Sequence, residues 1–203
     1  MILSAKALAQ EIRIGNGANT DGICVIPAPD LSDLEDRGEA SVNLRLGRWF
    51  VTMRQTNETV ILPTPEGNRK IGKLSKQHFV PFAKEFVLHP NRFVLAATLE
   101  WIRLPPSYAA FVVGKSSLGR RGIIIETAAG VHPGFCGCLT LEIANVGEIP
   151  VQLSSGMMIG QLFVHRIHGT VGAATTPLAG QRKPRLGDIR VDPIYERLKK
   201  TIV

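Results

Sequence analysis

Short apolar runs, separated by turn-forming residues, dominate the chain from residue 79 onward. They cover residues 86–88, 92–98, 109–113, 122–125, 138–144, 151–153 and 161–167, and Pro, Gly, Asn or Ser stands between most of them. Upstream, residues 41–47 alternate apolar and polar side chains, which is the period of a half-buried strand, and residues 49–54 continue it. Strands at this spacing, without segments of helical period between them, predict an all-β barrel or jelly roll.

Short helices are expected at the two ends of the chain. Ser4 is suited to cap a helix over residues 5–12, in which Leu8 and Ile12 share one face. Residues 193–203 carry apolar side chains four positions apart, which predicts a short closing helix.

Three polar segments, rich in Gly and Pro, are expected to connect these elements. Residues 13–38 are interpreted as a long connection and residues 56–77 as a surface excursion. Residues 169–184 are small, polar and rich in Pro and Gly, which is typical of a mobile arm.

Length and composition favour one ordinary globular domain. The chain has 203 residues, of which 44% are hydrophobic and 20% charged. No apolar run approaches the roughly 18 residues of a membrane span. Lys6 and Glu11 lie where a signal peptide needs its apolar stretch. Three cysteines do not suit a disulfide scaffold, so a reducing cytoplasm is the expected location.

A basic surplus favours an anionic partner. The net charge is +7, and residues 182–203, with seven Lys or Arg against three Asp or Glu, supply +4 of it. The alternative interpretation of that segment is a solvated tail. Two Trp and two Tyr are too few for a stacking platform, and no nucleic-acid reading motif is present, so nucleic acid is not expected as a partner.

The densest polar cluster follows the predicted strand at 109–113. Its sequence, GKSSLGRRG at 114–122, combines glycines, hydroxyls and cations, which suits binding of phosphate oxygens. It is not a P-loop, because that motif needs Gly at position 109, which is Ala. The alternative is a Gly/Ser turn with solvated cations.

Glu142 is the most informative single residue. In the predicted strand around it, Leu139, Leu141 and Ile143 share one face, whereas Thr140 and Glu142 share the other. A carboxylate amid apolar sequence costs free energy unless it faces water or a partner. Partial burial raises the pKa of such a carboxyl and suits it to proton transfer near neutral pH. The open alternative is that this face of the strand is simply solvated.

Metal-binding patterns are weak. Cys136 and Cys138 flank a glycine but lack a second ligand pair at zinc spacing, and the zinc-deaminase signature is absent. They are interpreted as structural cysteines near a turn. His132 lies in AGVHPGF at 129–135, which is predicted to be a hairpin between two strands.

Several of these blocks together resemble the dCTP deaminase family of the dUTPase-like superfamily. The blocks that carry the resemblance are residues 1–4, 41–47, 98–100, 104–105, 114–120, 129–130, 133–135, 141–142 and 156–162, and Gly137. The resemblance implies a mainly β fold, a distorted jelly-roll or β-barrel of the β-clip type with short terminal helices. It also implies a homotrimer with active sites between subunits, Mg²⁺ bound through the triphosphate, and no zinc or other metal ligand from the protein.

The resemblance assigns roles to residues of this chain. Glu142 would be the general acid/base, Ser116 and the Ala129 carbonyl would orient the attacking water, and Arg120 would hold Glu142 and stabilise the tetrahedral intermediate. The other residues implied to contact substrate are Lys115, Ser117, Leu118, Gly119, Val131, His132, Thr140, Leu141, Gln161, Gln181 and Arg182.

Four positions depart from the family pattern. His132 stands where an Asp contacts the sugar, in a hairpin that is one residue shorter, and Asn43, Glu126 and Leu178 replace Asp, His and Tyr. An imidazole hydrogen-bonds a hydroxyl but does not replace a fixed anion. His132 therefore argues against cleavage of the triphosphate.

The sequence therefore predicts an enzyme of pyrimidine deoxynucleotide metabolism that hydrolyses dCTP to dUTP and ammonia. One alternative is a bifunctional enzyme that forms dUMP, and another is a non-catalytic or altered-specificity cytosine-nucleotide binder. The expected organisation is a catalytic domain over residues 1–182, with a nucleotide-closing arm at about 169–185, and a basic extension over 186–203. No membrane partner is expected.

Overall fold

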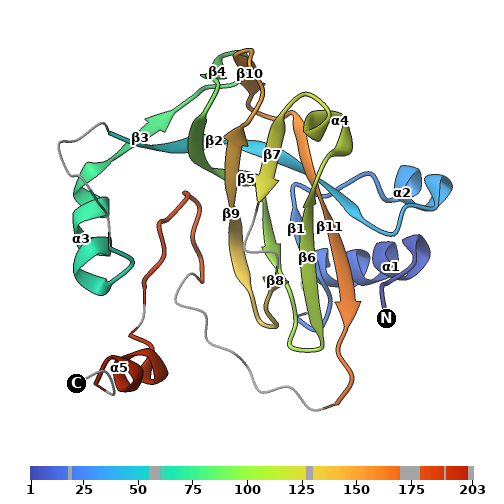
Figure 1. The fold of residues 1–203 in the computed structure, drawn as a ribbon. Helices are drawn as coiled ribbons and strands as arrows, with labels where there is room; N and C mark the ends of the chain where they lie inside the picture. Colours follow the sequence, from blue (N-terminus) through green and yellow to red (C-terminus); the bar gives the residue numbers. More distant parts are fainter. Residues whose placement is uncertain are drawn as a thin grey trace.

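The protein is described here by a computed structural model, which covers residues 1–17, 20–54, 60, 62–126, 130–169, 179–189 and 191–200. Most strands join one antiparallel sheet in the order β7-β9-β5-β2-β11-β6-β8, with β1 paired to β5 and β3 paired to β2 (Figure 1). The strands of this sheet are β1 (Cys24–Ile26), β2 (Val42–Met53), β3 (Ser75–Phe79), β5 (Arg92–Arg103), β6 (Tyr108–Gly114), β7 (Ile123–Glu126), β8 (Gly130–Val131), β9 (Cys136–Asn145) and β11 (Met158–Arg166). A separate pair is formed by β4 (Glu85–Leu88) and β10 (Val151–Ser154).

The sheet curls back toward itself. Strands β6 and β7 lie near opposite ends of the strand order, yet a Cβ placed on Gly114 at the end of β6 would lie 3.2 Å from Ile125 Cβ on β7. The expectation of a mainly β, barrel-like fold with short terminal helices is confirmed. The helices are α1 (Ala5–Asn16), α2 (Leu31–Arg37), α3 (Pro65–Leu74), α4 (Ser116–Gly119) and α5 (Pro193–Lys200).

Alternating apolar positions build the core on one face of the sheet. Leu141 and Ile143 of β9, Phe50 of β2 and Leu162 of β11 are fully buried there. Helix α1 adds Leu8 and Ile12, as its spacing predicts, and the Ser4 hydroxyl accepts a hydrogen bond from the Ala7 N–H at 3.4 Å. Burial of these side chains is the main stabilising term of the fold.

Two of the expected connections contain more structure than predicted. Residues 13–38 include the end of α1, strand β1 and helix α2, and residues 56–77 include α3 and part of β3. Short elements of this kind are held by caps, such as the Thr64 hydroxyl, which accepts from the Gly67 N–H at 3.2 Å. Among the described residues, no helix is long and apolar enough to cross a membrane.

Strands β2 and β5 approach each other closely where the register of their pairing shifts. The shifts fall between Leu46 and Phe50 on β2 and, against β9, between Ala97 and Trp101 on β5. A Cβ at Gly47 would lie 2.7 Å from the Ala97 carbonyl oxygen, so only glycine fits this position. The two irregular stretches border a cavity that is described below.

Candidate functional site

The loop after β6 forms a compact polar turn around α4. The Lys115 carbonyl accepts from the N–H groups of Leu118 and Gly119 at 3.0 Å, which fixes the turn. Ser116, Ser117 and Arg120 are exposed, and Lys115 and Leu118 are half-buried. Exposed hydroxyls and a guanidinium on one short turn provide the donors that phosphate oxygens accept from.

Lys115 connects this loop to the neighbouring strands. Its Nζ donates to Asn43 Oδ1 on β2. Asn43 pairs in register with Gln161 on β11, whose Nε2 donates to Ser41 Oγ at 3.1 Å. The structure therefore brings together Lys115 and Gln161, two of the predicted substrate contacts, through one residue of β2.

Glu142 and Thr140 lie on the half-buried outer face of β9, while Leu141 between them is in the core. This is the division of faces that the alternation predicts. Glu142 pairs in register with Leu95 of β5, which is 4% exposed, and with Glu126 of β7. A carboxylate that is partly shielded from water beside an apolar strand is a candidate to accept and donate protons in a reaction.

The end of the expected arm is docked on β9. The Gly180 N–H donates to the Cys136 carbonyl at 2.7 Å, and the Cys138 N–H donates to the Gln181 carbonyl at 2.8 Å. Gln181 is 8% exposed, and its Nε2 lies 2.9 Å from the Cys138 carbonyl and 3.2 Å from Thr140 Oγ1. Gly137, with φ of +147°, lets the segment approach, since a Cβ there would lie 3.0 Å from the Gln181 carbonyl oxygen.

The chain continues from Gln181 across the outer face of the sheet toward α3, as Figure 1 shows. The Arg185 N–H lies 3.3 Å from Thr140 Oγ1, and Lys183 Nζ lies 3.8 Å from the centre of a Trp49 ring. Asn68 Nδ2 on α3 donates to the Gly187 carbonyl at 2.9 Å. We call residues 179–189 the docked segment. Trp49 and Asn68 were not predicted as contacts of this segment, because neither belongs to a recognisable motif.

The predicted hairpin around His132 is wrong, because the strands on either side of it do not pair with each other. Strand β8 pairs with β6, with Val131 opposite Ala110, whereas β9 pairs with β5 and β7. The turn between β8 and β9 is closed by the Phe135 N–H, which donates to the His132 carbonyl at 3.1 Å. His132 is exposed and Val131 is buried. Ala129, the predicted water-orienting residue, and Leu178 lie outside the described residues.

Within the described part of the chain, the cysteines do not belong to a cluster of metal ligands. There, no group of three or more His, Cys, Asp or Glu side chains gathers to hold a metal ion. Cys138 is 7% exposed, and burial raises the pKa of its thiol, although the nearby Arg182 charge acts in the opposite direction. A protonated, buried thiol of this kind is unreactive.

A protein-family model described as dCTP deaminase-like matches residues 2–167 of this chain. The chain belongs to the dCTP deaminase-like family. This confirms the resemblance drawn from the sequence blocks. The matched range ends at residue 167, before the docked segment. The family match therefore does not extend to the contacts of that segment.

Individual relatives carry two different names. A dCTP deaminase of Natronomonas pharaonis is 46% identical over 124 residues, which are 61% of this chain and 63% of the relative. A dCTP deaminase, dUMP-forming, of Salinispora arenicola is 38% identical over 168 residues, which are 82% of this chain and 80% of the relative. The match to the Natronomonas protein thus spans less than two thirds of that protein's length.

A solved structure supports the fold. The 2′-deoxycytidine 5′-triphosphate deaminase from Agrobacterium tumefaciens superposes with a TM-score of 0.58 at 22% identity, covering 82% of this chain and 48% of that chain. At this identity the likeness concerns the fold alone.

Asn68→Ala is expected to loosen the docked segment of this dCTP deaminase-like protein. The substitution removes the side-chain hydrogen bond to the Gly187 carbonyl, and a net loss of about 1 kcal/mol corresponds to about fivefold more of the undocked form. Limited trypsin digestion, followed by mass spectrometry, measures cleavage after Arg182 and Arg185. Lys73→Ala, an exposed change on the same helix, is the control. Equal cleavage rates in the Asn68 variant and the unaltered protein would contradict a latching role.

Proposed function

We propose that the protein hydrolyses dCTP to dUTP and ammonia. The observation that carries the proposal is the half-buried Glu142 on the outer face of β9, beside Thr140, in a chain of the dCTP deaminase-like family. A carboxylate in that position is able to move protons for a reaction at the neighbouring base.

In this reaction, Glu142 takes a proton from the water that attacks C4 of cytosine. The water oxygen bonds to C4, and the bond from C4 to the exocyclic amino nitrogen breaks. Of the two water protons, one ends on the amino group, which leaves as ammonia, and the other ends on N3 of the ring, with Glu142 carrying the transfer. Ser116 and the Ala129 carbonyl orient the water, and Arg120 stabilises the tetrahedral intermediate, as the family resemblance implies. The backbone of Thr140 and Leu141 contacts the base, and Val131 and His132 contact the sugar.

The triphosphate binds at the α4 loop through Lys115, Ser116, Ser117 and Arg120. The sequence from 114 to 122 offers cations and hydroxyls but no carboxylate, so it suits a Mg²⁺ ion that is held by phosphate oxygens and water. When bound, the ion would neutralise part of the phosphate charge. Gln161, Gln181 and Arg182 complete the nucleotide contacts.

A homotrimer with active sites between subunits is part of the proposal. Phe111 and Val113 support it, because they are 45% and 49% exposed on the same side of β6, where an apolar strip facing water is unfavourable. Light scattering after size exclusion measures the oligomer.

We also propose one catalytic domain over 1–182, with the basic extension following it, and a cytoplasmic location.

A second candidate is a bifunctional enzyme that forms dUMP. The Salinispora arenicola relative named dUMP-forming matches 82% of this chain, more than the Natronomonas protein does. Against it stands His132, which offers no fixed anion at the sugar.

Chromatography of the nucleotides formed from dCTP and Mg²⁺ is expected to give dUTP as the stable product. Equimolar ammonia should appear with it, since each C–N bond broken releases one. A control incubation with dUTP alone should leave dUTP intact. A dUMP peak without free dUTP would favour the bifunctional enzyme, and unchanged dCTP would contradict deamination.

A further inference from the structure

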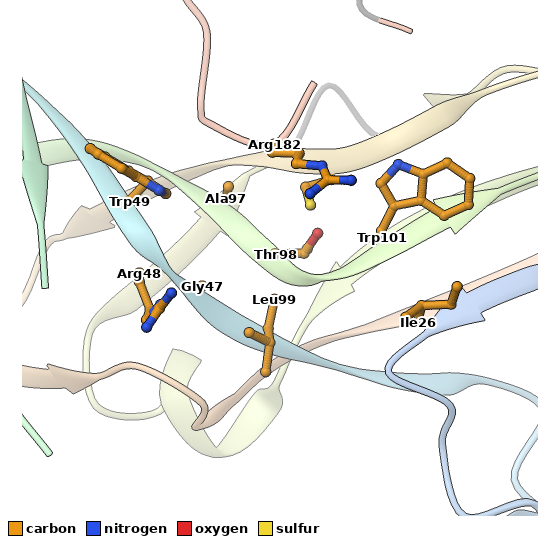
Figure 2. Close-up of a pocket in the computed structure, with 10 residues that line it drawn as sticks. Ile26, Gly47, Arg48, Trp49, Ala97, Thr98, Leu99, Trp101 and Arg182 are labelled. Carbon is orange, nitrogen blue, oxygen red and sulfur yellow. The ribbon is translucent and has the colours of Figure 1, made fainter. Parts of the chain in front are cut away.

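A cavity of about 450 Å³ lies on the outer face of the sheet, at the irregular stretch of the pairing between β2 and β5 (Figure 2). Both tryptophans of the chain, Trp49 and Trp101, line it. Figure 2 shows the Arg182 guanidinium between the two indole rings. A volume of this size suits a ligand as large as a mononucleotide, since small-molecule sites run from about 300 to 1,000 Å³. We call it the β2–β5 cavity.

The charges of the β2–β5 cavity are of one sign. Arg48 and Arg182 line it, and none of the residues that line it is Asp or Glu. The Arg48 guanidinium carbon lies 4.8 Å and 4.9 Å from the ring centres of Phe79 and Phe82, which hold it in place. Guanidinium groups and indole rings that line one cavity suit an anion with a flat ring.

The cavity is separate from the position of Glu142. Its closest residue on β9 is Cys138, and Glu142 lies four residues further along, about 13 Å at the usual rise of a strand. Arg182 is the one cavity residue that is also among the proposed dCTP contacts, and its five N–H groups can serve two acceptors. It directly follows Gln181, which is buried against Thr140. A ligand that binds Arg182 therefore also holds the docked segment.

We propose that the β2–β5 cavity binds a planar anion of nucleoside-monophosphate size, and that this ligand holds the docked segment on β9. The coupling to dCTP binding rests on the proposed function, whereas binding in the cavity does not. If the ligand and dCTP both favour the docked segment, each raises the affinity for the other by the same factor.

The two tryptophans make the binding directly measurable. The full-length protein is titrated with deoxyuridine 5′-monophosphate, and tryptophan fluorescence and calorimetric heat are followed together. Saturable quenching with one binding event per chain is expected, and deoxyuridine or inorganic phosphate alone should bind about tenfold more weakly, since each lacks half of the contacts. No heat and no quenching up to millimolar concentration would overturn the site.

Variants test the location of the ligand. Arg48→Gln and Trp101→Ala should each weaken binding about tenfold by calorimetry, whereas Arg37→Gln, at an exposed ion pair on α2, should not. Circular dichroism checks that each variant is folded. An unchanged affinity in the folded Arg48 and Trp101 variants would place the ligand elsewhere and overturn the assignment.

A competition experiment separates this site from the substrate site. The titration is repeated on Glu142→Gln with saturating dCTP and Mg²⁺, where quenching should persist. Loss of quenching would mean that the monophosphate occupies the dCTP site, which overturns a distinct cavity site. The monophosphate should also slow trypsin cleavage after Arg182, and an unchanged rate would overturn the link to the docked segment. If the protein does not bind dCTP at all, quenching that is lost in Arg48→Gln still supports the cavity, so the two proposals fail independently.

Discussion

Glu142→Gln is expected to lower the kcat of dCTP deamination at least about a thousandfold while leaving the affinity for dCTP within a few-fold of the unaltered protein. The amide keeps the size of the side chain but neither accepts a proton from water nor passes one to ammonia. The phosphates, which provide much of the binding free energy, contact the α4 loop in the proposed site and not Glu142. Single-turnover kinetics and a calorimetric titration with dCTP and Mg²⁺ measure the two quantities separately.

Glu148→Gln is the matched control, because Glu148 is exposed in the turn after β9. It should retain the full rate. Deamination by Glu142→Gln at the rate of the control would remove Glu142 from the mechanism. A large loss of dCTP affinity together with rate would instead assign Glu142 a role in binding.

Glu100→Ala is expected to lower the free energy of unfolding by about 3 kcal/mol. Glu100 is 1% exposed, and its Oε2 accepts from the Arg45 backbone N–H at 2.8 Å while Oε1 lies 3.3 Å from Arg45 Nη1. The substitution leaves a buried N–H without its acceptor and creates a cavity. Urea unfolding measures the change, and Glu85→Ala, an exposed position on β4, serves as the control.

Glu100 also makes the stability of the folded protein depend on pH. Burial raises the pKa of the Glu100 carboxyl above its ordinary value, although the Arg45 contacts act in the opposite direction. Because the folded-state pKa is the higher one, Glu100 contributes stability below the unfolded pKa of about 4.3, and this contribution is lost as pH rises through the folded pKa. Glu100→Gln lacks this titration, so its stability relative to the unaltered protein should improve as pH rises from about 4. If the Glu100→Gln variant instead became less stable relative to the unaltered protein as pH rises, Arg45 would be stabilising the ionised carboxylate.

Features that depend on neighbours in the chain could be predicted from the sequence. The alternation in β9 identifies Glu142 and Thr140 as sharing the face opposite to Leu141, and the structure has the same division. The Ser4 cap and the apolar spacing locate α1 and α5. Helix α2 was missed, although its Asp30 cap accepts from the N–H groups of Ser32 and Asp33, because a helix of seven residues has too few apolar positions to show a period.

The partners of each strand and loop could not be predicted in this way. Alternation does not identify β6 as the partner of β8, since any strand edge offers the same backbone donors and acceptors. The bond between Asn68 and Gly187 joins residues 119 positions apart, and the Arg45–Glu100 contact joins residues 55 apart.

The sequence by itself determined where most of the strands lie, which face of β9 carries Glu142, and the family to which the chain belongs. Only the tertiary structure decided that residues 179–189 lie across that face, that α3 holds them, and that Trp49 and Trp101 share one cavity with Arg182. The physical reason is that hydrophobic period and capping act over a few residues, whereas strand order and docking follow from the packing of the whole chain around one core.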